Sequence, residues 1–154
     1  MTIRCEVVSQ DRTVFEGDVD IVVIPGMDGE MGILPNHSPL LSTIRLGVVK
    51  VRYIGTEENF TITGGLVEVQ PDIVTILADA AENVEEIDIA RAEEARERAE
   101  VRLAEGPPSG TDAYLAAEAA LRRSSLRLDA SRRLGQVRRR RADFPSGTTG
   151  GDAD

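Results

Sequence analysis

The sequence is poor in the residues that build most catalytic and metal sites. Its 154 residues include one cysteine, one histidine and no tryptophan. A lone Cys5 excludes an internal disulfide and is compatible with a reducing compartment. No CxxC, HExxH, calcium-loop or P-loop spacing occurs, so no metal centre or phosphate cradle of those kinds is expected. His37 has no identifiable catalytic partner, and the sequence therefore predicts a protein that is not an enzyme.

Long apolar runs are also missing. No stretch approaches the roughly 18 apolar residues that a membrane-spanning helix needs, and the N-terminus lacks the pattern of a signal peptide. Aromatic residues make up only 3% of the chain, so Val, Ile, Leu and Ala must form the core. These features predict a soluble, intracellular protein, which can still dock on something bound to a membrane.

The charges are unevenly distributed along the chain. The net charge is −9, and all but one of the 18 basic residues are arginine. Acidic residues dominate positions 1–86, and basic residues are in excess over 87–141. In the last stretch, 142–154, the only charged residues are three aspartates. The basic part is thus a candidate for binding an acidic partner. Nucleic-acid binding is not expected, because the run Arg138–Arg141 lacks interleaved aromatics and the whole chain is acidic.

The first half of the chain has the pattern of short strands. Residues 3–9 alternate between apolar and polar, and further β-rich segments follow at regular spacing. Turn residues such as Gly55, Gly64-Gly65 and Pro71-Asp72 separate them, which favours an antiparallel sandwich or barrel over residues 1–84. The glycines and prolines of 29–41 predict a strand that ends in a shaped surface loop. The other expected strands are 13–15, 19–24, 48–54, 60–63, 66–69 and 73–77.

The second half has the pattern of two helices. Asn83 and Glu86 resemble a capping box, and small and apolar residues then recur every three or four positions as far as Leu103. The stretch 105–110 must break this helix, and Thr111 or Asp112 can cap a second helix that runs to about Arg141. Small-residue stripes on both helices predict an antiparallel hairpin over 85–141.

The predicted fold class is therefore α+β, with an N-terminal antiparallel β-sandwich followed by a C-terminal two-helix hairpin. The final segment, 142–154, has no core-forming residues over most of its length, and we expect a disordered acidic tail. Because the hairpin stripes bury little apolar area, docking of the hairpin on the sandwich should be marginal, and more than one pose is expected.

A charged cluster lies at the start of the hairpin. Asp88 and Arg91 are three residues apart, so on a helix they share one face with Arg98 further along. Arg123 and Arg127 lie on the segment that folds back. The cluster is either an anion site or a solvated helix surface. The residues alone favour the solvated surface, because surface pairs of this kind contribute only about 0.2–0.5 kcal/mol.

Two stretches resemble a known family. Residues 29–41 (GEMGILPNHSPLL) and 64–79 (GGLVEVQPDIVTILAD) are similar to conserved-looking blocks of the epsilon subunit of F-type ATP synthases, and the likeness spans residues 1 to about 134. The resemblance implies a non-catalytic rotor subunit at the cytoplasmic face of the cell membrane. Its sandwich would bind the gamma subunit and the c-ring, with Glu30 and His37 as contacts, and would couple proton flow to ATP synthesis.

The resemblance also implies a regulatory role for the hairpin. In this family the hairpin either folds onto the sandwich or extends toward the catalytic head, where it inhibits ATP hydrolysis. A basic second helix would then meet acidic segments of the alpha and beta subunits. The arginines that fit this role are Arg122, Arg123, Arg127, Arg132 and Arg133.

Some bacterial members of the family bind ATP as a regulatory ligand with the folded hairpin. Residues 87–92 (IDIARA) match their motif, although the stiff loop at 106–110 and the long tail depart from the family pattern. No catalytic cofactor is implied. The ATP-binding residues that the resemblance implies are Glu82, Ile87, Asp88, Arg91, Ala92, Arg98, Arg123 and Arg127.

Two other functions remain open at this point. A free-standing ATP-sensing module, unattached to a synthase, would show the same hairpin motif. A sandwich-fold carbohydrate enzyme would need aromatic platforms and a matched pair of acids, and the sequence offers neither.

Overall fold

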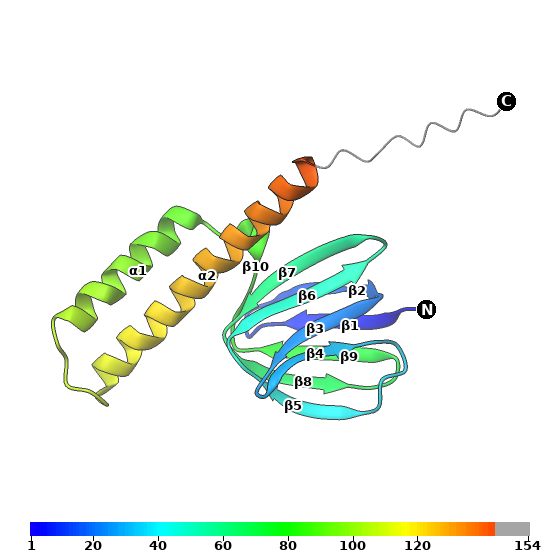
Figure 1. The fold of residues 1–154 in the computed structure, drawn as a ribbon. Helices are drawn as coiled ribbons and strands as arrows, with labels where there is room; N and C mark the ends of the chain where they lie inside the picture. Colours follow the sequence, from blue (N-terminus) through cyan, green and yellow to red (C-terminus); the bar gives the residue numbers. More distant parts are fainter. Residues whose placement is uncertain (144–154) are drawn as a thin grey trace.

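A computed structural model of the chain describes residues 1–143, and Figure 1 shows a body of strands with a pair of helices beside it. The sandwich-then-hairpin prediction is confirmed. The strands are β1 (Ile3–Val8), β2 (Thr13–Val19), β3 (Ile21–Gly26), β4 (Gly29–Ile33), β5 (Leu40–Ile44), β6 (Gly47–Tyr53), β7 (Thr56–Ile62), β8 (Gly65–Val69), β9 (Ile73–Ala78) and β10 (Ala81–Asn83).

The strands form one continuous hydrogen-bonded sheet that folds over on itself. Its order is β10-β7-β6-β3-β5-β8-β9-β1-β2, and β4 pairs with β3. Neighbouring strands are antiparallel except β1 and β9, which are parallel, so the prediction of a purely antiparallel sheet was wrong at this pair. Strands distant in sequence can pair in either direction when a long connection joins them, and alternation alone does not report this.

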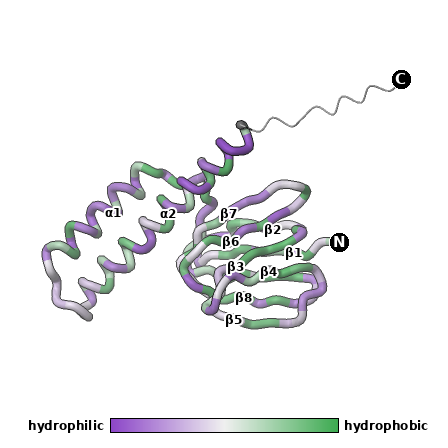
Figure 2. The backbone as a smooth tube through the Cα atoms, in the orientation of Figure 1, coloured by the Kyte–Doolittle hydropathy of each residue, from purple (hydrophilic) through white to green (hydrophobic). Residues whose placement is uncertain are grey.

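Alternating side chains from the strands fill the interior of the sandwich. In Figure 2 green and purple positions follow one another along several strands. The core consists mainly of β-branched residues, with Phe60 as its largest member, and Cys5 is fully buried within it. Phe15 packs against Phe60 at 5.7 Å between ring centroids. This core contains only residues from 3 to 78, so the sandwich has the means to fold without the hairpin.

One glycine is fixed by a close approach between strands. Gly65 has φ +140°, and a Cβ placed there would lie 2.1 Å from the carbonyl oxygen of Leu77 on β9. Only a residue without a side chain fits at this point of the β8–β9 pairing. The Gly64-Gly65 pair is therefore both a turn signal and a packing requirement.

Two strands were not expected from the sequence. The predicted surface loop ended at residue 41 and no strand was assigned before residue 48, yet residues 40–44 form β5 and pair with β8. Residues 81–83 form the short strand β10 on the outer edge of β7. β5 is only five residues long and follows two prolines, so its apolar–polar alternation gives a weak strand signal. β10, with three residues, is too short to show a pattern.

The hairpin begins later than its sequence signal suggests. Asn83 does accept a hydrogen bond, from the Glu85 backbone N–H at 2.9 Å, but it caps the short 3₁₀ helix η1 (Val84–Glu86). The helix α1 (Ile89–Ala104) starts after Asp88, whose carboxylate accepts from the Arg91 backbone N–H at 3.1 Å. The expectation that Asp88 lies within the helix, on the face of Arg91, was therefore wrong.

The second helix, α2, spans Asp112–Asp143. Thr111 caps it, since its hydroxyl accepts from the Tyr114 N–H at 3.3 Å. Positions 142 and 143 thus belong to α2 rather than to the expected tail. The rest of that expected disordered segment, 144–154, lies outside the described residues.

Small residues bring the two helices close together. Ala92 and Ala99 of α1 and Ala117, Ser124 and Leu128 of α2 are buried. Figure 1 shows α2 between α1 and the sandwich, so α2 makes most of the contact with the strands. A small cluster of Val84, Ile87 and Ala130, with Val48 and Leu134 against it, joins the hairpin to the sandwich. This joint is much smaller than the sandwich core, as the sequence predicts.

Candidate functional site

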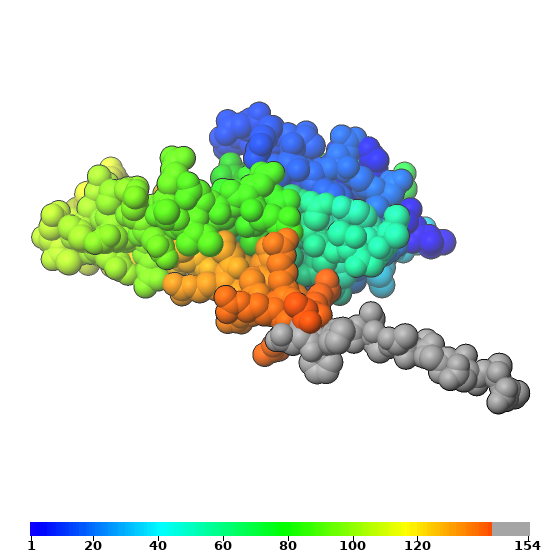
Figure 3. All heavy atoms as spheres, turned by 90° about the horizontal axis from the view of Figure 1, so that it is seen from above, coloured from blue at the N-terminus to red at the C-terminus, as the bar shows by residue number. Residues whose placement is uncertain are grey.

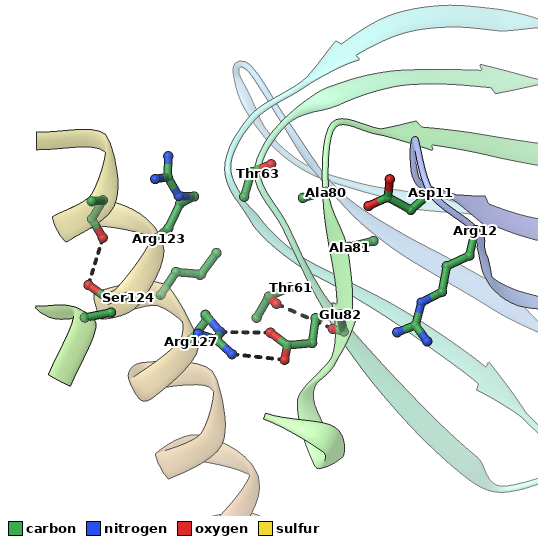
Figure 4. Close-up of a pocket in the computed structure, with 13 residues that line it drawn as sticks. Asp11, Arg12, Thr61, Thr63, Ala80, Ala81, Glu82, Arg123, Ser124 and Arg127 are labelled. Carbon is green, nitrogen blue, oxygen red and sulfur yellow. Dashed lines mark hydrogen bonds and ion pairs between the residues drawn. The ribbon is translucent and has the colours of Figure 1, made fainter. Parts of the chain in front are cut away.

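A pocket lies along the seam where the hairpin meets the sandwich (Figure 4). It has a volume of about 490 Å³, within the range of small-molecule sites, which is roughly 300–1,000 Å³. We call it the seam pocket. Its lining residues are Asp11, Arg12, Thr61, Thr63, Ala80, Ala81, Glu82, Ala95, Ala120, Arg123, Ser124, Leu126 and Arg127.

The strongest polar contact in the seam pocket joins β10 to α2. The guanidinium of Arg127 donates from Nε to Glu82 Oε2 at 2.8 Å and from Nη2 to Glu82 Oε1 at 3.0 Å. Both side chains are about 30% exposed. This two-pronged geometry is the preferred way in which arginine holds a carboxylate, and the same fork suits phosphate oxygens.

The other polar groups of the seam pocket have weaker contacts or no charged partner. Arg123 has no carboxylate within 4.0 Å among the described residues, and Figure 4 shows its guanidinium directed away from the Glu82–Arg127 pair. Thr61 donates its hydroxyl to the Glu82 carbonyl at 3.4 Å. Ser124 is buried and donates to the carbonyls of its own helix. The pocket therefore offers three cations: Arg123, which has no carboxylate partner among the described residues, Arg12, which lies 3.8 Å from Glu86, and Arg127, which is held by Glu82.

Three of the predicted ATP-binding residues line the seam pocket together: Glu82, Arg123 and Arg127. Glu82 comes from β10 and the two arginines come from α2, and Arg127 is 45 positions after Glu82 in the sequence. Their meeting depends on the hairpin lying against the sandwich. The pocket is thus a feature of the folded pose alone.

The remaining predicted ATP-binding residues have other positions. Ile87 and Ala92 are buried at the base of the hairpin, and Asp88 is the N-cap of α1. Arg91 and Arg98 are exposed and do not line the seam pocket. They lie four residues before and three residues after the pocket-lining Ala95, which places them on the same face of α1, and Arg98 forms a 3.8 Å pair with Glu94.

The sequence did not single out the far wall of the seam pocket. Asp11 and Arg12, in the turn between β1 and β2, close the pocket opposite α2 (Figure 4), and Arg12 lies 3.8 Å from Glu86. No local signal marks a two-residue turn as part of a pocket. Only the pairing of β1 with β9 and the path of β10 bring this turn to the seam.

The two loop residues expected to contact partners lie on the sandwich. Glu30 is exposed on β4, where Lys50 reaches it at 3.5 Å. His37 follows Asn36, which has φ 62°, in the loop between β4 and β5. The His37 Nδ1 lies 2.7 Å from the Ser38 carbonyl oxygen. Within the loop the His37 N–H donates to the Leu34 carbonyl at 3.2 Å, and the Asn36 N–H donates to the Pro71 carbonyl of the β8–β9 turn at 2.9 Å, so the loop is held both by its own backbone and by a neighbouring turn.

The basic residues predicted to face an acidic partner lie on α2. Arg122, Arg132 and Arg133 are all exposed. Arg122 donates to Glu118, one turn earlier, at 2.8 Å. An exposed pair of this kind contributes little to stability, so its arginine can exchange partners at small cost.

Within residues 1–143 no cluster of potential metal ligands occurs, and no helix there is long and apolar enough to cross a membrane.

Comparison with known proteins identifies the class to which this fold belongs. Residues 2–84 match the family model described as the ATP synthase delta/epsilon chain beta-sandwich domain, and residues 85–132 match the model of its long alpha-helix domain. The chain belongs to the ATP synthase delta/epsilon chain family.

Its curated relatives define the member more narrowly. The ATP synthase epsilon chain of Dehalococcoides mccartyi is 49% identical over 129 residues, which cover 82% of this chain and 89% of the relative. The epsilon chain of Halalkalibacterium halodurans is 45% identical over 132 residues, covering 86% and 98%. Within the family the chain is therefore an epsilon-type member, and it is non-catalytic.

Solved structures show the same fold. A chain in the mitochondrial ATP synthase OSCP/F1/c-ring structure of Euglena gracilis aligns with a TM-score of 0.71 and 26% identity, covering 84% of this chain and 81% of that one. A chain in the central stalk and c-ring structure of the Tetrahymena thermophila enzyme aligns with a TM-score of 0.54 and 14% identity, covering 85% and 97%. The second likeness concerns the fold alone.

Proposed function

We propose that the protein is a central-stalk subunit of a bacterial rotary ATP synthase and helps to couple proton translocation to ATP synthesis. The observation that carries this proposal is the match of both family domains, in order, over residues 2–132. In the proposed assembly the sandwich binds the gamma subunit and the c-ring, with Glu30 and His37 in the contact. The protein then lies at the cytoplasmic face of the membrane and reaches it only through the c-ring.

The hairpin is the regulatory part of the proposed subunit, and ATP is its ligand. Support comes from the seam pocket, where Arg123 and Arg127 of α2 and Glu82 of β10 lie together only while the hairpin is docked. A nucleotide bound by both arginines of α2 and also by the sandwich wall of the pocket, at Thr61 and Thr63, would hold α2 against the sandwich. A ligand that binds only one pose stabilises that pose by RT ln(1 + [L]/Kd), so ATP would shift the hairpin toward the docked pose.

The Glu82–Arg127 pair determines how ATP enters. In the docked pose the Glu82 carboxylate holds the Nε–Nη2 edge of Arg127, which is two of the five N–H donors of the guanidinium. Phosphate oxygens would bind the remaining donors at Nη1 and Nη2, or would replace the carboxylate while Glu82 turns to a hydroxyl or amino group of the nucleotide. Arg91 and Arg98, which are exposed on α1 on either side of Ala95, would add charge when their side chains turn toward the pocket.

The undocked hairpin has a different proposed partner. Extended toward the catalytic head, α2 would present Arg122, Arg132 and Arg133 to acidic segments of the alpha and beta subunits and inhibit ATP hydrolysis. The electrostatic support is the excess of arginine on this helix against the acidic sandwich. ATP scarcity would then favour the inhibitory pose.

Two experiments test these proposals separately. The purified protein and the gamma subunit from the same source should elute together in size-exclusion chromatography; ATP binding without any affinity for gamma would instead favour a free-standing ATP-sensing module. Deleting residues 87–154 leaves the sandwich core complete. An assembled synthase with that truncation should keep coupling and hydrolyse ATP faster, whereas an unchanged rate would contradict an inhibitory hairpin.

A further inference from the structure

A second cavity lies on the other part of the seam, between the C-terminal half of α2 and strands β6 and β7. Its volume is about 400 Å³. In Figure 3 the orange end of α2 lies directly against the teal segment that contains β7, which is where this cavity is found. Leu126 is the one residue that also lines the seam pocket, so the two cavities are neighbours with largely separate walls.

The walls of this α2–β6 cavity are apolar on both sides. Val48 and Val84 contribute from the sandwich and the linker, and Leu134 and Val137 contribute from α2. Val137 remains 48% exposed, so the apolar surface is only partly covered in the docked pose. Covering exposed apolar surface contributes roughly 25 cal/mol per Å². A ligand with a hydrocarbon body would therefore gain from entering.

The rim of the cavity carries three cations and two carboxylates, and the carboxylates are already engaged. Glu30 lies 3.5 Å from Lys50. Glu57 accepts from Arg52 at 2.6 Å and from Asn59 at 3.3 Å. Burial acts to raise the pKa of Glu57, but these hydrogen bonds outweigh it and the pKa is lowered, so Glu57 stays ionised and bound to its partners.

Two guanidinium groups at the rim remain available. Among residues 1–142, whose side chains the structure describes, neither Arg45 nor Arg133 has a carboxylate within 4.0 Å. Arg45 follows β5, and Arg133 is on α2, so they approach the cavity from opposite sides of the seam. Two guanidinium groups that line one cavity beside apolar side chains suit a ligand with a carboxylate on a hydrocarbon chain.

We infer that the α2–β6 cavity is a second ligand site that takes a single-chain amphiphilic carboxylate, such as a medium-chain fatty acid. The chain lies between the apolar side chains of α2 and the sandwich, and the carboxylate lies at Arg45 and Arg133. Because the walls come from both parts of the molecule, the ligand also holds the hairpin down. Binding itself does not depend on the proposed role in a synthase or on ATP.

The test is a titration of the full-length protein with monomeric decanoate, below its micelle concentration, followed by calorimetry and by methyl NMR. We expect saturable binding with shifts of the Leu134 and Val137 methyl signals and little change at Thr61 and Thr63. Decyltrimethylammonium, with the same chain and the opposite charge, should bind at least tenfold more weakly. Equal binding of both amphiphiles, or shifts confined to the seam pocket, would overturn the inference.

Substitutions test whether decanoate binding needs Arg45 and Arg133 or only the general positive charge of α2. Arg45→Ala with Arg133→Ala should weaken decanoate binding at least tenfold. Arg139→Ala, an exposed arginine on the same end of α2 that does not line the cavity, should leave it unchanged. Should both variants bind alike, the proposal fails.

Two further arms exclude other occupants. Binding to anionic phospholipid vesicles but not to monomeric decanoate would point to a membrane surface and overturn the inference. Self-association that Val137→Glu abolishes would assign the surface to a second copy of the chain. Circular dichroism of every variant should match the parent, and ATP titration reports separately on the seam pocket.

Discussion

Arg127 and Glu82 form a two-pronged ion pair that ties the middle of α2 to the last strand of the sandwich, at 2.8 and 3.0 Å. In the described part of the chain the only other side-chain ion pair between α2 and the rest of the molecule joins Arg138 to Glu85. Both side chains of the central pair are mostly shielded from water, and the pair lies inside the seam pocket. The pair therefore has two competing effects. It holds the hairpin on the sandwich, and its carboxylate competes with any anion that enters the pocket.

Replacing Glu82 separates those roles. Glu82→Gln keeps the shape and removes the charge, and we expect hairpin docking without nucleotide to weaken by about 1–2 kcal/mol, after allowance for solvent screening. Hydrogen exchange of α2 amides measures this as faster exchange in the variant. Arg122→Ala is the matched control, because its partner Glu118 lies on the same helix. Equal exchange in Glu82→Gln and the parent would show that the pair does not hold the hairpin.

Substitutions at Asp88 show whether this residue supports ATP binding by capping the start of α1 or by contacting the nucleotide directly. Asp88→Ala removes the cap on the Arg91 N–H and should destabilise the start of α1 by about 0.5–2 kcal/mol. Asp88→Asn keeps a capping oxygen. We expect the alanine variant to bind ATP at least tenfold more weakly, about 1.4 kcal/mol, and the asparagine variant to stay close to the parent. Calorimetric titration decides, and an equally large loss in both variants would mean that the carboxylate itself contacts the nucleotide.

Cys5 gives a probe of the sandwich core. Its side chain is fully buried, and burial, with a smaller effect of Glu6, raises the pKa of the thiol from 9.0 to about 12. The native protein should therefore resist alkylation at pH 8, and urea should expose the thiol in step with unfolding. Because the unfolded thiol ionises first, this group makes the protein less stable as the pH rises from 9 toward 12. Rapid native labelling would contradict a closed core.

Gly135 is a weak point in α2. It lies within the helix, yet a Cβ there would meet no atom within 4 Å, so no packing requires a glycine. Gly135→Ala should stabilise the C-terminal part of α2 by about 0.5–1 kcal/mol, seen as slower amide exchange. Gly106→Ala is the contrast, since Gly106 also has open space but a φ of +72°, and alanine there should destabilise the end of α1. Faster exchange in Gly135→Ala would reveal a need for flexibility that the packing does not show.

The sequence carries much of this architecture in its local patterns. Alternation and turn residues predict the strands with a strong signal, and small-residue stripes predict the closely packed hairpin. The local patterns did not predict strands whose formation or direction depends on pairing with distant segments. β5 follows two prolines and β10 is only three residues long. The parallel β1–β9 pair joins segments about seventy residues apart. The start of α1 was misplaced because Asn83 and Asp88 are both good caps, and only the intervening 3₁₀ turn shows which one begins the helix.

The candidate site was also predicted only in part from the sequence. Resemblance pointed to Glu82, Arg123 and Arg127, and the fold brings these three to one pocket. Arg12 could not be predicted, because its place in the pocket follows from strand pairing far from the hairpin. Arg91 and Arg98 remain predictions for the site, since in the docked pose they flank the pocket-lining Ala95 from the exposed face of α1.

The central claim is that the seam pocket binds ATP and thereby holds the hairpin on the sandwich. One measurement tests it most directly, an ATP titration of the isolated full-length protein followed by NMR, with Arg123→Ala and Arg127→Ala alongside. The account predicts saturable shifts at Thr61, Thr63 and Ala81, slower exchange of α2 amides as ATP binds, and at least tenfold weaker binding in each variant. Saturable binding that leaves the seam residues and the α2 exchange unchanged would contradict it.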